Sequence, residues 1–162
     1  MNRTARSMML QVSVLAALLG AWLTPRYEVL AEDATISESP AASDYRSPFA
    51  VVASPDGKTI YATDQTGGRL SILDAASLAL CGEVELRGRP QGLALSQDGS
   101  TLYVAEHGAS SVAVIDTSKR AVTSRIAVGL WPTAVALGEQ SRRLYVANQD
   151  RDSISVIDLS QQ

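Results

Sequence analysis

Short runs in which apolar and polar residues alternate fill the chain from Pro48 onward. They are rich in β-branched and aromatic residues and are bounded by Gly, Pro, Asp or Ser, which is typical of β-strands. In the first unit, Pro55-Asp56-Gly57 predicts a tight turn, because glycine accepts the positive φ that such a turn needs. The pattern predicts four strands in this unit, over residues 49–54, 59–63, 69–73 and 83–87.

The same pattern returns every 42 residues without a gap. Three positions of the repeat are identical each time, and their residues are Pro48, Pro90 and Pro132; Tyr61, Tyr103 and Tyr145; and Asp74, Asp116 and Asp158. A period of about 40–45 residues made of short strands is typical of a four-stranded propeller blade. We therefore predict an all-β fold with about three blades, at 47–88, 89–130 and 131–162, the last of them incomplete.

Each repeated position has a structural interpretation. The tyrosines fall in the second strand of each blade, where an aromatic side chain packs between sheets. The aspartates end the third strand, where a carboxylate accepts backbone N–H bonds in the turn that follows. The prolines begin the innermost strand, at a position where proline costs no ladder bond. None of these three columns is expected to carry function.

The repeated strings carry a family resemblance. Two tetrads resemble the YVTN-type β-propeller repeat: Tyr103-Val104-Ala105-Glu106 and Tyr145-Val146-Ala147-Asn148. The run Ser54-Pro55-Asp56-Gly57, which precedes the second strand of the first blade, also fits this repeat. The resemblance extends from Pro48 to Asp158 and is specific for the fold. It implies an exported binding scaffold or a propeller module attached to a redox enzyme. The resemblance also extends to the propeller lactonases, which are catalytic.

The number of blades departs from the family. Propellers close with about four to eight blades, whereas about eleven strands are predicted here, too few for a ring. Three alternatives stay open: the sequence is the front of a longer propeller, two copies complete one ring by self-association, or the array is open and marginally stable. The first alternative is favoured.

The N-terminus predicts export. Arg3 and Arg6 precede an apolar stretch, 8–23, which is followed by small residues at the usual cleavage spacing. Residues 1–31 therefore read as a signal peptide that leaves Glu32 as the mature N-terminus, with residues 32–46 as a flexible linker. An uncleaved signal anchor is the alternative, and the only expected link to a membrane. The expected location is the periplasm or the extracellular space.

Charge and cysteine content exclude several classes of site. The formal net charge is −3, and it becomes more negative once the leader is removed, so nucleic acid is not an expected partner. Cys81 is the only cysteine, which excludes an intramolecular disulfide and a paired-cysteine metal or haem site. Its apolar neighbours predict that Cys81 is a small buried hydrophobe.

Functional candidates come from positions that differ between blades, since loops carry binding. His107, the only histidine, lies beside Glu106 in a predicted loop, and Trp131, aligned with Arg89, precedes the third innermost strand. Asn148, Asp150 and Asp152 lack the glycine and terminal glutamate of a calcium loop. We find no catalytic set, metal site or cofactor motif. The candidate binding residues are Trp131, His107, Glu106 and Arg89.

The predicted function is therefore a non-catalytic binding or interaction scaffold, with a protein or small-molecule ligand that the sequence does not identify. The alternative is the propeller module of an extracytoplasmic, cytochrome-associated redox system. A lactonase is the third alternative. Such an enzyme needs a full ring of blades and carboxylates that converge on its channel.

Overall fold

The computed structural model describes residues 46–138 and 142–161. The predicted signal peptide, 1–31, and all but the last residue of the predicted linker, 32–46, lie outside the described residues. Within the described part of the chain, no helix is long and apolar enough to cross a membrane.

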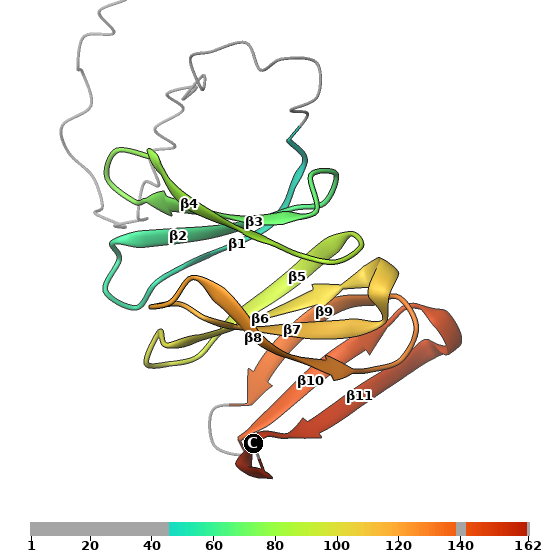
Figure 1. Ribbon diagram of the computed structural model, residues 1–162. Coiled ribbons are helices and arrows are strands. Elements are labelled where there is room, and N and C mark those ends of the chain that lie inside the picture. Colours follow the sequence, from blue (N-terminus) through green and yellow to red (C-terminus); the bar gives the residue numbers. More distant parts are fainter. Residues whose placement is uncertain (1–45, 139–141, 162) are drawn as a thin grey trace, which may run out of the picture. The chain divides into compact units, whose positions relative to one another are not determined.

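Three antiparallel sheets follow one another along the chain (Figure 1). The first consists of β1 (Pro48–Ala53), β2 (Thr59–Asp64), β3 (Arg69–Asp74) and β4 (Leu80–Glu85). The second has β5 (Pro90–Leu95), β6 (Thr101–Glu106), β7 (Ser111–Asp116) and β8 (Ala121–Ala127). The third has β9 (Pro132–Gly138), β10 (Arg143–Asn148) and β11 (Ser153–Asp158). Short 3-10 helices lie at His107–Ala109 (η1), Asp150–Asp152 (η2) and Leu159–Gln161 (η3).

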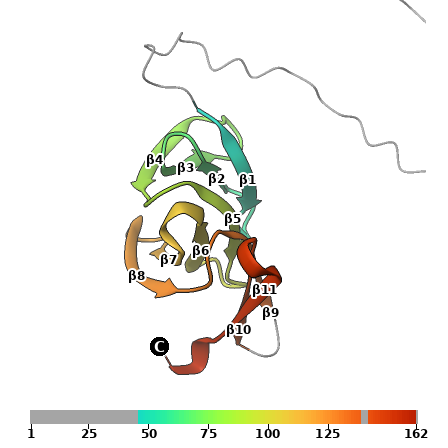
Figure 2. The same cartoon turned by 90° about the vertical axis from the view of Figure 1, so that its right-hand side faces the viewer.

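Strand order within each sheet follows the sequence, from β1 to β4, β5 to β8 and β9 to β11. This arrangement, with each sheet packed against the next, confirms the predicted β-propeller blades (Figure 2). The fourth strand of the first blade differs from the prediction, because it begins at Leu80 instead of residue 83. The reason is a register irregularity at Ile72/Leu73, which lets Leu80 pair with Leu73 directly after the turn.

The core lies between blades. Alternate residues of each strand face opposite neighbours, so that Tyr61, Leu70 and Ile72 of the first blade pack against Leu102 and Val104 of the second. In the same way, a second cluster joins the second blade to the third: Tyr103, Val112, Val114, Leu144 and Val146. Tyr61 and Tyr103 therefore pack between sheets, as predicted. Tyr145, for which the same packing is predicted, is instead 37% exposed, because no described sheet packs on that side of the third blade.

The aspartate column has its predicted structural role. Asp74 Oδ1 accepts the backbone N–H groups of Ala76 and Ser77, and Asp116 Oδ1 accepts those of Ser118 and Lys119. Asp158 repeats the arrangement with Ser160. These bonds hold the turns after the third strands, as expected for carboxylates in such turns.

Cys81 is exposed, so the prediction of a buried thiol is wrong. It lies in β4, the outermost strand of the first sheet, which has a hydrogen-bonded neighbour only in β3. Residues on such an edge strand lack cover on one side, whatever the hydropathy of their neighbours. Cys81 Sγ donates only a weak bond, to the carbonyl of Ala79 at 3.6 Å.

Candidate functional site

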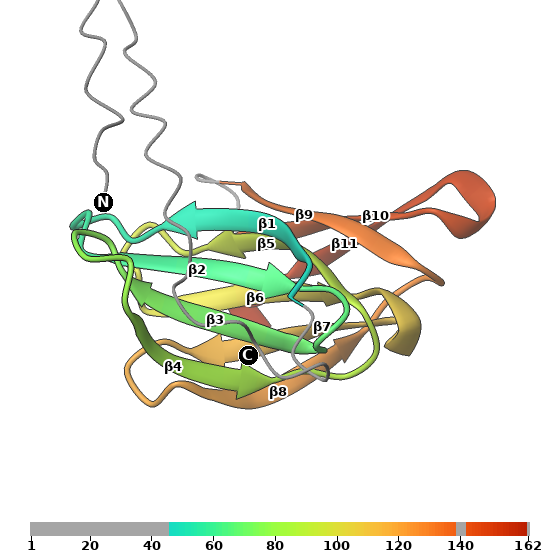
Figure 3. The same cartoon turned by 90° about the horizontal axis from the view of Figure 1, so that it is seen from above.

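The loops that vary between blades gather at one end of the sheets. Because neighbouring strands are antiparallel, the blade-to-blade connections, 86–89 and 128–131, lie at the same end as the loops between second and third strands, 65–68, 107–110 and 149–152 (Figure 3). We call this the connection end. The opposite end, called the turn end, holds the regular turns 54–58, 74–79, 96–100 and 116–120.

One backbone bond recurs in every blade at the connection end. The N–H of Gln65 donates to Ser47 O at 3.0 Å, that of His107 to Arg89 O at 3.1 Å, and that of Gln149 to Trp131 O at 3.0 Å. These three pairs occupy the same positions of the 42-residue repeat. The backbone is therefore a common frame, on which the side chains differ from blade to blade.

His107 and Trp131, two of the predicted candidates, lie together. Their rings stack with centroids 6.1 Å apart and planes 25° apart, which joins η1 of the second blade to the connection before β9. Trp131 is 52% exposed. His107 is half-buried, and its Nδ1 is buried with no hydrogen-bond partner among the described residues. The pair thus presents an indole at the surface, supported from behind by an imidazole.

The backbone of Trp131 is in the left-handed region, with φ at 56°. A bulky residue there costs of order 1–3 kcal/mol and persists only where the surroundings hold it. In the connection between the first two blades the positive φ falls instead on Gly88, which pays no such penalty. The backbone of the connection before the third blade is therefore strained at Trp131, whereas the connection before the second blade places its positive φ on a glycine and is not strained there.

Glu106 is not a loop residue, and that prediction is wrong. It is the last residue of β6 and has no exposed surface. Its carboxylate accepts the N–H of Arg87 at 2.8 Å, the hydroxyl of Ser111 at 2.7 Å and the Nε–H of Arg125 at 3.0 Å. A buried carboxylate needs such partners, so Glu106 closes the end of its sheet and does not face solvent.

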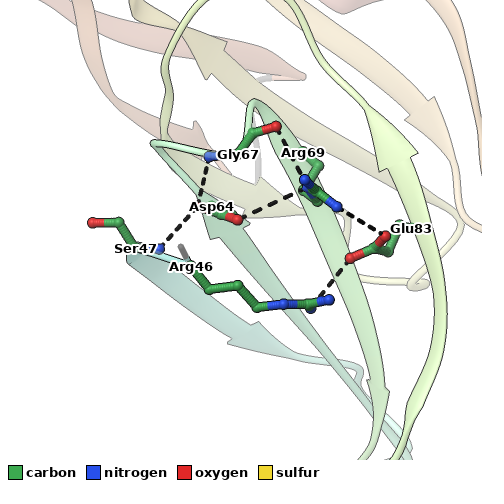
Figure 4. A network of polar contacts seen from close by, with 6 residues as sticks. All are labelled: Arg46, Ser47, Asp64, Gly67, Arg69 and Glu83. Atoms are coloured by element: carbon green, nitrogen blue, oxygen red, sulfur yellow. Dashed lines mark hydrogen bonds and ion pairs between the residues drawn. The ribbon is translucent and has the colours of Figure 1, made fainter. Parts of the chain in front are cut away.

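In the first blade, different residues provide the partners of a buried carboxylate (Figure 4). Asp64, at the position of Glu106, accepts the N–H groups of Ser47 and Gly67, both at 2.9 Å. Arg69 lies 3.9 Å from Asp64 and 3.3 Å from Glu83, which also pairs with Arg46 at 3.2 Å. Burial raises the pKa of Asp64, but the two N–H groups and Arg69 outweigh this, and the pKa is lowered.

In the third blade the same position holds Asn148, which is also buried. Its Nδ2 donates to Ser155 Oγ at 2.9 Å and to Ser153 Oγ at 3.2 Å. Asp64, Glu106 and Asn148 thus form a column of buried polar residues that sequence analysis missed. The three residues lie 42 positions apart, but they differ in identity, so the repeat pattern alone does not mark them as a column.

Arg89, the fourth candidate, is exposed, and its carbonyl receives the His107 N–H described above. The connection end therefore brings together Arg89, His107 and Trp131, with Glu106 buried beneath the surface. Across residues 46–138 and 142–161, no three His, Cys, Asp or Glu side chains come together as metal ligands.

Comparisons with known proteins agree with this architecture. A region of hydrazine synthase from Kuenenia stuttgartiensis superposes with a TM-score of 0.69 at 31% identity, covering 78% of this chain. A protein from Lactobacillus plantarum superposes with a TM-score of 0.63 at 24% identity, covering 70% of this chain. This chain spans only 36% and 38% of the lengths of those two chains. No curated protein sequence matches it.

The family comparison covers most of the sequence. The family described as lactonase, seven-bladed β-propeller, matches over residues 25–121 and again over residues 82–162. The second match begins within the first, as expected of a chain built from repeats of one blade. The chain belongs to the lactonase family of seven-bladed β-propellers.

Proposed function

We propose that this protein is an exported, non-catalytic β-propeller of the YVTN repeat type, whose connection end binds a protein partner through Trp131. The observation that carries the proposal is the exposed indole of Trp131, held on a strained backbone and supported by His107. Strained, over-determined residues cluster at functional sites.

The chemistry of the surroundings favours a protein partner. Leu130 is exposed beside Trp131, and Arg89 is exposed on the neighbouring connection. Tryptophan and arginine are enriched among the residues that carry most of the binding energy at protein interfaces. Glu106, which directly precedes His107 in sequence, is fully buried and held by three donors, which suits a structural role better than contact with a substrate.

Site-specific photo-crosslinking tests this proposal. A photoreactive phenylalanine analogue replaces Trp131 in cells that export the protein, and a matched analogue replaces Lys58, which is exposed at the turn end. We expect a discrete protein adduct from position 131 and none from position 58. Equal labelling at both positions, or no adduct at position 131, would overturn the proposal.

A redox-system propeller is the second candidate, because the region of similarity at 31% identity comes from a hydrazine synthase. The same crosslinking experiment distinguishes the two candidates. An adduct with a haem protein favours the redox module, whereas an adduct with a protein without redox groups favours the general scaffold.

Catalysis has its own test, since the family name includes lactonases. Purified protein is added to δ-gluconolactone, and acid release is followed at constant pH. We expect the spontaneous rate of hydrolysis. A faster rate that His107→Ala abolishes would show an enzyme and contradict the non-catalytic proposal.

Export is tested by N-terminal sequencing of the protein recovered outside the cytoplasm. The leader pattern predicts a mature chain that begins at Glu32. A chain that still begins at Met1 would contradict cleavage and favour a signal anchor.

A further inference from the structure

Two exposed arginines lie in the connection between the first and second blades. The side chains of Arg87 and Arg89 have no hydrogen-bond or ion-pair partner among the described residues. Their backbone, in contrast, is fixed at both positions. The N–H of Arg87 donates to the buried Glu106 carboxylate at 2.8 Å, and the carbonyl of Arg89 accepts the N–H of His107 at 3.1 Å. The chain therefore presents two unpaired guanidinium groups on an anchored backbone.

His107 links this connection to the exposed indole. Its backbone bonds to Arg89, and its ring stacks on Trp131 with centroids 6.1 Å apart. Leu130, next to Trp131, is 51% exposed. We call Arg87, Arg89, Leu130 and Trp131 the arginine–tryptophan surface. It lies where the connection end of the second blade meets that of the third, so its exposure does not depend on the outward sides of the first and third blades.

Other charges at the connection end already have partners. Glu106 is buried and pairs with Arg125 at 3.0 Å. Glu83 of the first blade pairs with Arg46 at 3.2 Å and with Arg69 at 3.3 Å. These carboxylates therefore do not compete for the arginines of the arginine–tryptophan surface.

The remaining acidic side chains at this end lie away from the two arginines. Glu85 ends β4 and lies opposite Arg69 in the strand ladder of the first blade. Asp150 and Asp152 belong to η2 of the third blade, where the N–H of Asp150 donates to the carbonyl of Leu130 at 3.4 Å. The sign of the charge thus changes across the exposed indole, from cationic on the side of the second blade to acidic on the side of η2.

We propose that the protein partner binds the arginine–tryptophan surface through an acidic segment, with an apolar residue against Trp131 and carboxylates against Arg87 and Arg89. This inference rests on the proposed function and adds the chemistry of the partner. The planar guanidinium matches a carboxylate with two parallel hydrogen bonds, which gives direction as well as attraction. The formal net charge of the whole chain is −3, which disfavours a polyanion such as nucleic acid as the occupant.

Photo-crosslinking from position 131 in cells that export the protein tests the proposal when charge variants are added. Replacing both arginines, Arg87→Glu with Arg89→Glu, should lower the yield of the protein adduct by about tenfold or more, because like charges then face each other. Lys58→Glu, the same reversal at the turn end, is the matched control and should leave the yield unchanged. Asp152→Asn removes an exposed acid on the other side of the indole, so it should not lower the yield.

A second pair of substitutions guards against misfolding. Arg87→Gln with Arg89→Gln removes the cations without bringing acids close to the buried Glu106, and urea denaturation shows whether each variant folds. If the glutamate pair lowers the free energy of unfolding, the glutamine pair decides, and its adduct yield should also fall. Mass spectrometry of the adduct should place the crosslink in a segment rich in Asp and Glu.

The outcomes separate this inference from the proposed function. An adduct whose yield survives loss of both arginines, or which maps to a protein segment without acidic residues, would overturn the acidic segment and leave a protein partner at Trp131. The absence of any adduct from position 131, or an adduct with nucleic acid, would overturn both.

Discussion

The imidazole of His107 stacks on the indole of Trp131, and this contact joins the second blade to the third at the connection end. Stacked aromatic pairs contribute about 0.5–1.5 kcal/mol beyond the area that they bury. From sequence alone, His107 reads as a loop residue whose removal costs within about 0.5 kcal/mol. The structure predicts a larger loss of stability, because the His107 ring is half-buried and stacks on Trp131.

His107→Ala should therefore lower the free energy of unfolding by about 1 kcal/mol. A double-mutant cycle with Trp131→Ala, measured by urea denaturation, should give a coupling energy of similar size. Gln65→Ala, at the same position in the first blade, is the control and should stay within about 0.5 kcal/mol. Zero coupling between His107 and Trp131 would show that the stack adds nothing to stability.

The tyrosine column offers a comparison within one repeat position. Tyr103→Ala should cost about 3–5 kcal/mol, because the ring is buried between two blades. Tyr145→Ala should cost about 1 kcal/mol or less, since its side chain is 37% exposed. Both are measured by urea denaturation. Equal costs would contradict the difference in burial.

The fold was predictable because its signal is redundant. The alternation of apolar and polar residues, the turn residues and the 42-residue period each predict strands in blades, and all agree. The predicted roles of the tyrosine and aspartate columns follow from the same redundancy. A residue repeated at one position in every blade serves what every blade needs, which is packing and turn formation.

The site was less predictable because it depends on contacts between blades. The stack of His107 on Trp131 arises from the rotation of one blade against the next, which no local pattern encodes. Glu106 was misread as a loop residue because a charged side chain at a strand end looks the same in sequence whether it is solvated or buried with partners. The exposure of Cys81 depends on β4 being an outer strand, although its neighbours in sequence are apolar.

The turns at the turn end predict a dependence of stability on acid. Hydrogen bonds, first of all from Ser96, lower the pKa of Asp98 to about 2, and the Ser54 hydroxyl likewise lowers the pKa of Asp56. The folded state therefore binds fewer protons than the unfolded state in this range. The stabilisation is present above the ordinary aspartate pKa of about 4 and is lost as the pH falls towards about 2.

Ser96→Ala should raise the pKa of Asp98 towards its ordinary value, because it removes the principal hydrogen-bond donor. Carboxyl titration followed by NMR measures this directly. Asp56 lies in the equivalent turn with Ser54 intact, so its pKa should stay low in the same sample. An unchanged pKa at Asp98 would mean that the serine hydroxyl does not hold the carboxylate.

The last prediction concerns the buried polar column and the way that two blades stabilise it. In the second blade, Glu106 pairs directly with Arg125 of β8, and Ser111 donates its hydroxyl. In the first blade, the position of Arg125 holds Glu83, and the position of Ser111 holds Arg69, which lies between the two acids. The second blade therefore has a direct ion pair, whereas in the first blade one arginine interacts with two carboxylates.

Arg125→Glu should therefore be strongly destabilising by itself. It removes the cation from a fully buried carboxylate and brings a second negative charge to it, and breaking a buried pair costs about 3–5 kcal/mol. Adding Ser111→Arg rebuilds the arrangement of the first blade and should recover a substantial part of that loss. Ser111→Arg alone should not stabilise the protein, because Arg125 already occupies the site.

Urea denaturation of the wild type, both single variants and the double variant completes the cycle. A favourable coupling energy between positions 111 and 125, well above 1 kcal/mol, is expected for residues in one ion-pair network. The equivalent reversal in the first blade, Arg69→Ser with Glu83→Arg, should leave Asp64 paired and behave alike. Simple additivity at 111 and 125 would show that the two blades balance their buried carboxylates independently of these partners.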